Sequence, residues 1–183
     1  MLKAMLLALP LLPSVALSAH RPQLTVSLEN AVKATYLYKL APFVQWPAGT
    51  FASSDAPFEI CVVGGNPFDH FLDKAIAGRK LGTHPFAVRW LGDAATADDC
   101  QIVFIAEPDA DATRAALQVF AGKPVLTVTD TGTSNDVGSV VQFVLDHGHV
   151  RFDVDNAAAA RNHLVISSKL LNLALSVKGG DGA

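Results

Sequence analysis

The feature that most constrains the fold is an alternation of short apolar segments with segments of helical periodicity. The run 101–106 is almost wholly apolar, 124–129 is a second such run, and a helical segment at 110–121 separates them. Strands that are apolar on both faces are typical of the centre of a parallel sheet, because helices then cover both faces. The alternation therefore predicts an α/β fold.

The same alternation extends over most of the chain. We expect additional strands at 58–63 and 84–91, the first followed by a helix that ends at 77, and a hairpin with strands 140–146 and 149–154. Further helices are predicted at 156–160 and from Ser167 or Ser168 through 177. The sequence shows no internal repeat or linker, which predicts a single three-layer Rossmann-like domain over 28–178. Its sheet should be mostly parallel with a C-terminal hairpin, followed by a disordered tail at 179–183.

Composition narrows the class of protein. A chain of 183 residues matches one domain, and 50% hydrophobic with only 17% charged residues indicates a large core. The formal net charge is −3. Without a basic excess, nucleic acid is not an expected partner.

The first helix, expected over 28–46, is unusually apolar. Leu28, Val32, Tyr36 and Leu40 recur every four residues and form a stripe along it. The opposite side is also nearly free of charge, and a helix that is apolar all round is covered on two sides. We therefore expect one side to meet a partner protein or a second copy. Leu37 and Tyr38 are the predicted contact residues, because they lie away from the stripe.

The two cysteines lie near the starts of two predicted strands, Cys61 in the first and Cys100 just before the third. If the strands are ordered 2-1-3, as in many doubly wound sheets, these starts are neighbours and a disulfide fits. The closed loop of about 40 residues would contribute roughly 4 kcal/mol in the chain-entropy model. Two buried free thiols are the alternative. A catalytic redox pair would require Cys-x-x-Cys spacing.

Three short motifs resemble sites of chemistry. Residues 130–133 read Asp-Thr-Gly-Thr, as in an aspartic protease, but that chemistry needs two such carboxylates and one copy is present. The turn 64–68 follows a strand but lacks the glycine pattern of a nucleotide site. His147 and His149 have no third metal ligand at a defined spacing. The sequence therefore predicts no catalytic residue, no metal site and no cofactor.

The N-terminus has the pattern of a secretory signal peptide. Lys3 is followed by an apolar run over 4–17, and small residues then lead to a cleavage site after Ser18. We expect residues 1–18 to be removed, a polar lead-in at 19–27, and an exported, disulfide-permissive location.

Several segments resemble YfiR-like proteins in their order along the chain. The segment 32–47 (VKATYLYKLAPFVQWP) resembles the opening helix of that family. The further matching segments are ICVVG at 60–64, CQIVFI at 100–105, PVLTVTD at 124–130, VRF at 150–152 and ISSKLL at 166–171. The resemblance extends over about residues 29–175.

This resemblance implies a periplasmic protein that represses a membrane-bound diguanylate cyclase by acting on its periplasmic part. Cyclic di-GMP synthesis and biofilm formation would then fall. In that system an outer-membrane lipoprotein can sequester the repressor. The resemblance also implies an oxidised Cys61–Cys100 pair. The family's best-known member has a second pair around 132–150, where this sequence has no cysteine.

Two other classes of function are compatible with the sequence. One is a periplasmic small-molecule-binding protein, with its site in the crevice beyond the strand ends near 64–68 and Glu107. The other is a small exported hydrolase that depends on Asp130. Ligand-dependent thermal stabilisation would favour the first, and turnover lost on changing Asp130 would favour the second.

We predict that the mature protein begins near Ala19 or His20. The apolar segment that ends in small residues is the physical reason, because signal peptidases recognise that pattern. N-terminal sequencing of protein from a periplasmic extract is the measurement. An intact Met1 in the cytosolic fraction would contradict the prediction.

Overall fold

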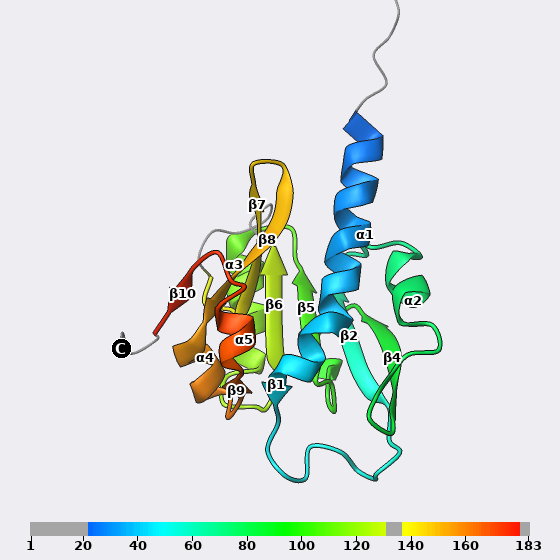
Figure 1. Cartoon of the computed structure of the whole chain (residues 1–183), viewed down its shortest axis with the longest axis vertical. Coiled ribbons are helices and arrows are strands. Elements are labelled where there is room, and N and C mark those ends of the chain that lie inside the picture. The colour runs from blue at the N-terminus through cyan, green and yellow to red at the C-terminus, as the bar shows by residue number, and fades with distance from the viewer. Residues whose placement is uncertain (1–21, 131–136, 180–183) are drawn as a thin grey trace, which may run out of the picture.

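The computed structural model of the chain describes residues 22–130 and 137–179. Within them an eight-stranded sheet has the order β10-β8-β7-β6-β5-β2-β4-β3 (Figure 1). Its strands are β2 (Phe58–Gly64), β3 (Lys80–Leu81), β4 (His84–Leu91), β5 (Ile102–Ala106), β6 (Leu126–Asp130), β7 (Val141–Asp146), β8 (His149–Asp155) and β10 (Val177–Lys178). A separate antiparallel pair joins β1 (Val44–Gln45) to β9 (Val165–Ile166).

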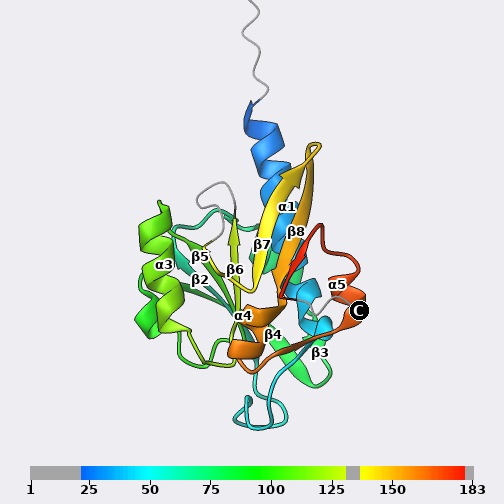
Figure 2. The same ribbon diagram turned by 90° about the vertical axis from the view of Figure 1, so that its left-hand side faces the viewer.

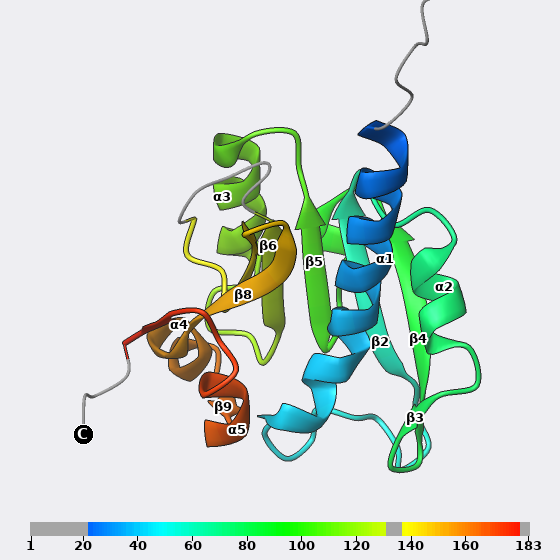
Figure 3. The same ribbon diagram turned by 45° about the horizontal axis from the view of Figure 1, so that its top comes forward.

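Helices cover both faces of this sheet, which confirms the predicted three-layer α/β fold. They are α1 (Pro22–Leu40), α2 (Phe71–Ile76), α3 (Ala110–Val119), α4 (Asn156–Arg161) and α5 (Ser168–Leu171), with 3-10 turns at Ala41–Phe43 and Ala94–Thr96. The helices α1 and α2 lie side by side over the β2–β4 half of the sheet (Figure 3). The helix α3 packs on the opposite face (Figure 2).

The sheet is mostly parallel, as the apolar runs predicted. The strands β4, β2, β5, β6 and β7 pair in parallel, and β8 returns antiparallel to β7. The first four residues of both β5 and β6 are buried, because each strand has a neighbour on both sides and core packing on both faces.

The strand order places the two cysteines together. Among the strands expected from the sequence, β2, β4 and β5 are the first, second and third. Their observed order β4-β2-β5 is therefore the predicted 2-1-3 arrangement. Cys61 and Cys100 form a disulfide with their Cα atoms 5.9 Å apart, and both are buried. The bond lies in the core beneath α3, among Val63, Val103 and Phe120. It ties the start of β5 to β2.

The first helix differs from the prediction in its bounds: it runs over Pro22–Leu40 rather than 28–46. At the C-terminal end of this helix Val44 leaves the helical path to pair with Ile166, and the N–H of Ser167 donates to the carbonyl of Phe43 at 2.9 Å. Pairing with β9 therefore ends the helix before Trp46.

The last helix is also shorter than predicted, because it stops at Leu171 rather than continuing through 177. The chain then runs along the open edge of β8. The N–H of Leu175 donates to the carbonyl of Phe152 at 2.8 Å, and that of Val154 donates to the carbonyl of Ser176 at 3.0 Å. Satisfying this exposed strand edge outweighs the local helical preference.

The apolar stripe of α1 is only partly buried. Leu40 of the stripe is buried together with Ala34, Leu37 and Ala41, and Val32 and Tyr36 pack against the same core, whereas Leu28 is 68% exposed. The small alanines let the helix backbone approach the sheet closely. Because α1 is apolar nearly all round, its periodicity could not indicate which side would be buried.

We predict that the variant with both Cys61→Ala and Cys100→Ala is less stable by about 2–4 kcal/mol, because its unfolded chain regains the entropy of the open loop. Urea unfolding of the variant and of the oxidised parent measures the difference. Adding a reductant should lower the stability of the parent and leave the variant unchanged. Equal midpoints for parent and variant would contradict a stabilising disulfide.

Candidate partner-binding groove

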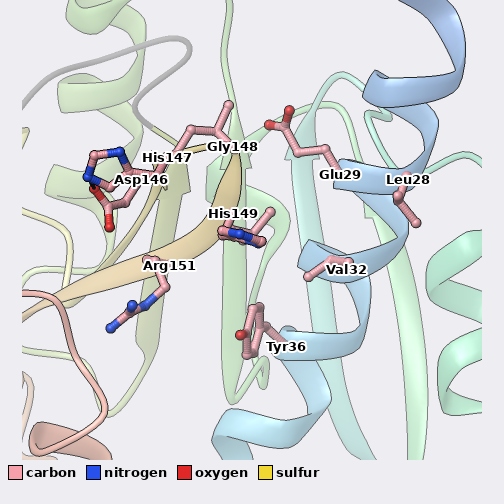
Figure 4. A pocket seen from close by; sticks show the side chains of 11 residues that line it. Leu28, Glu29, Val32, Tyr36, Asp146, His147, Gly148, His149 and Arg151 are labelled. Atoms are coloured by element: carbon pink, nitrogen blue, oxygen red, sulfur yellow. Dashed lines mark ion pairs between the residues drawn. The ribbon is translucent and has the colours of Figure 1, made fainter.

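A groove opens between the N-terminal half of α1 and the tip of the β7–β8 hairpin (Figure 4). Its volume is about 860 Å³. The helix contributes Leu28, Glu29, Val32 and Tyr36, and the hairpin contributes every residue from 145 to 151. Both walls extend beyond the body of the domain, so the groove is open to solvent (Figure 1).

The hairpin wall is built by a tight turn. His147 and Gly148 have φ of 48° and 77°, as a two-residue type I′ turn requires. Histidine is one of the residues that tolerate this conformation better than most. Across the hairpin Leu145 pairs with Val150, so both side chains lie on the face that carries the buried Phe143 and Phe152. The apolar face therefore continues past the core to Leu145, which is 54% exposed.

Aromatic contacts form the base of the groove. The ring of Tyr36 lies 6.0 Å from the rings of Phe143 and Phe152, centroid to centroid, and it packs edge-on against Phe152. Tyr36 is itself only partly buried. The base is therefore continuous with the core, and it holds the helix wall and the hairpin wall together.

A buried cation fixes the position of α1 beside the groove. Lys33 is buried, and its Nζ pairs with the carboxylates of Glu29 on the same helix and Asp130 at the end of β6. One turn away, the Asn30 side-chain amide donates to the carbonyl of Pro67 at 2.7 Å. These bonds tie the helix to the carboxyl ends of the parallel strands, so the groove wall has a defined position.

The lining of the groove combines apolar and polar side chains. Leu28 and Val32 of the helix and Leu145 and Val150 of the hairpin are its aliphatic members. The polar residues are Glu29, Asp146, His147, His149 and Arg151. Exposed apolar side chains with polar ones around them are typical of protein–protein interfaces.

The two predicted contact residues lie elsewhere. Leu37 is fully buried in the core of its own chain, so its side chain is not available to a partner. Tyr38 is half-buried beside the C-terminal half of α1, where its ring packs edge-on against Phe86 at 5.9 Å. Contact of Tyr38 with a partner remains a prediction. Sequence reasoning missed the residues of the hairpin tip. The alternation of apolar and polar residues up to Leu145 was the signal that could have indicated them.

The other motifs have structural partners in the fold. In the turn 64–68, the Asn66 side-chain oxygen accepts from the N–H groups of Phe68 and Asp69, which is a local turn motif. Asp130 is engaged by Lys33, and the rest of the 130–133 motif lies outside the described residues. His147 and His149 stand on the hairpin tip. Within residues 22–130 and 137–179, no group of three His, Cys, Asp or Glu side chains is placed to hold a metal.

At the predicted crevice beyond the strand ends, near 64–68 and Glu107, the ends of β2 and β5 lie close together. The N–H of Gly65 donates to the carbonyl of Ala106 at 3.1 Å, which joins the two strand ends. Gly64 has φ of +88°, and a Cβ added there would stand 2.9 Å from the same carbonyl oxygen. Glycine is needed at this position for both its conformation and the close approach.

Fold and groove together define a small Rossmann-like α/β domain with a surface suited to binding a protein. Within this class, a sequence profile of the YfiR/HmsC-like family matches residues 30–175, and the chain belongs to that family. None of the curated proteins matches the chain significantly. Among the helices of the described residues, none is long and apolar enough to cross a membrane.

We predict that Lys33→Met lowers the stability by about 1–3 kcal/mol. Removing the cation leaves the carboxylates of Glu29 and Asp130 close together, and their partial exposure makes the cost smaller than for a fully buried pair. Lys39→Met on the same helix is the matched control, because Lys39 is exposed. Chemical unfolding should show a change within about 0.5 kcal/mol for the control. Equal losses for the two variants would contradict a special role for Lys33.

Proposed function

We propose that this protein is an exported signalling regulator that binds the periplasmic part of a membrane diguanylate cyclase and represses it. Cyclic di-GMP and biofilm formation then fall. The observation that carries the proposal is the apolar groove between α1 and the β7–β8 hairpin. It lies almost wholly within the segment matched by the YfiR/HmsC-like family.

Repression by this route requires binding and no chemistry on the part of the regulator. The protein must favour the inactive state of the cyclase over its active state, and a tenfold preference corresponds to about 1.4 kcal/mol. Burying one leucine side chain contributes about 1.5–3 kcal/mol. Leu28 and Leu145, both exposed in the free protein, therefore have enough apolar surface to provide such a preference. We accordingly propose a binding protein rather than an enzyme.

The same proposal places the protein in the periplasm. A buried disulfide persists in that oxidising compartment and stabilises a domain of this size. We further propose that an outer-membrane lipoprotein relieves repression by sequestering the regulator away from the cyclase. A second copy of the chain is the other candidate partner, and Tyr38 is retained as a contact residue for it.

We predict that Leu28→Glu and Leu145→Glu each weaken binding to the cyclase periplasmic domain at least tenfold. Each change puts a charge in place of an apolar side chain of the proposed interface, while the exposed starting positions leave the fold intact. Leu173→Glu is the matched control, because Leu173 is 57% exposed but does not line the groove. Titration calorimetry with the purified periplasmic domain of the host's cyclase measures the affinities.

The same variants test function in cells. Deleting the gene should raise cyclic di-GMP, and an exported copy of the parent or of the Leu173→Glu variant should lower it again. A copy without residues 1–18 should not restore repression, and neither groove variant should do so fully. Unchanged cyclic di-GMP after deletion would overturn the proposal. Full repression by both groove variants would overturn the assignment of the groove.

A further inference from the structure

A second cleft lies at the other end of α1, between the helix and the segment 78–81, which includes β3. Its volume is about 460 Å³. Tyr38, Lys39, Pro42 and Phe43 line it from the helix and the 3-10 turn that follows, and residues 78–81 with Phe86 line it from the opposite side. The proposed partner groove shares none of these residues.

The charge of this cleft is opposite to that of the whole chain. Lys39, Arg79 and Lys80 line it, and no carboxylate does. The chain as a whole has 17 acidic residues against 14 basic ones. Three cations around one cleft produce a local positive potential that attracts an anion.

The central cation is held in place before any ligand arrives. The guanidinium carbon of Arg79 lies 4.8 Å from the centroid of the Tyr38 ring, and Nε donates to the carbonyl of Ala75 at 2.8 Å. The Arg79 backbone is held at both ends: its N–H donates to Ile76, and its carbonyl accepts from Phe86. These contacts use one guanidinium nitrogen, and within the described residues no hydrogen bond or ion pair involves the other two.

The apolar floor of the cleft is equally rigid. Tyr38 packs edge-on against Phe86, and Phe86 packs against the fully buried Phe58 with ring centroids 5.0 Å apart. Phe43 and Leu81 complete the apolar lining. A planar apolar body can therefore stack on a surface anchored in the core, at little cost in side-chain entropy.

We infer that this cleft binds a small organic anion that has an apolar, ring-containing body. The anionic group, a carboxylate, phosphate or sulfonate, bonds to Arg79 with Lys39 and Lys80 around it. The body packs on Tyr38, Phe43 and Phe86. A volume of about 460 Å³ falls in the range of small-molecule sites, about 300–1,000 Å³. This inference is independent of the proposed repression of a cyclase.

The test compares two probes that share their aromatic rings and differ in charge. The anionic probe is 8-anilinonaphthalene-1-sulfonate, and the neutral one is N-phenyl-1-naphthylamine. Fluorescence titration of the intact mature protein gives both dissociation constants. The variant is Arg79→Gln, and Arg151→Gln in the partner groove is the matched control.

We expect Arg79→Gln to weaken binding of the sulfonate at least tenfold, because a charge-assisted hydrogen bond is lost. The affinity of the Arg79→Gln variant for the neutral probe should change less than twofold. Arg151→Gln should leave the affinity for both probes unchanged. Raising the salt concentration should weaken binding of the sulfonate and leave binding of the neutral probe unchanged. Equal effects of Arg79→Gln on both probes, or no effect on the sulfonate, would overturn the inference.

A second variant covers the case in which Arg79→Gln does not fold. Lys39→Gln combined with Lys80→Gln removes two exposed cations and leaves the Arg79 contacts intact. This variant should bind the sulfonate severalfold more weakly than the parent does, and its unfolding temperature should be unchanged. Unchanged sulfonate binding by the folded double variant would also count against the inference. Neither result bears on cyclic di-GMP, so failure here leaves the proposed function standing.

Discussion

The close packing of α1 on the sheet is the contact on which the rest of the structure depends. Ala34 and Ala41 have side chains short enough to bring the helix backbone near the strands, and Leu37 and Leu40 fill the space between. Burying this side leaves Leu28 outward and Val32 partly exposed. The buried Lys33, paired with Glu29 and Asp130, holds the helix in this orientation, because an unpaired cation there would be costly.

Both candidate binding surfaces are consequences of that orientation. The N-terminal half of α1 extends beyond the sheet opposite the β7–β8 hairpin and forms the apolar groove. The C-terminal half ends beside β3 and the segment before it, and forms the basic cleft. The two surfaces differ in chemistry: the groove has exposed apolar side chains among polar ones, and the cleft has cations beside aromatic side chains. A single helix therefore lines both candidate surfaces.

The opposite face of the sheet has a different role. It holds the Cys61–Cys100 disulfide together with α3, and its core residues are separate from those beneath α1. The bond joins the middle of β2 to the region just before β5, whereas both candidate surfaces lie against α1. The disulfide therefore stabilises the scaffold without contributing atoms to either surface.

The sequence by itself determined the α/β class, most strand positions and the His147–Gly148 turn, because apolar runs, periodicity and turn chemistry are local properties. The sequence also predicted that the two cysteines can pair if the strand order is 2-1-3, and the sheet has that order. Only the tertiary structure decided which side of α1 is buried, since a helix that is apolar all round has no preferred face. Only the tertiary structure decided where the last helix ends, because the chain after it hydrogen-bonds to the open edge of β8. The basic cleft was beyond sequence reasoning because Lys39 and Arg79 are far apart in the chain, and only the packing of α1 beside β3 brings them together.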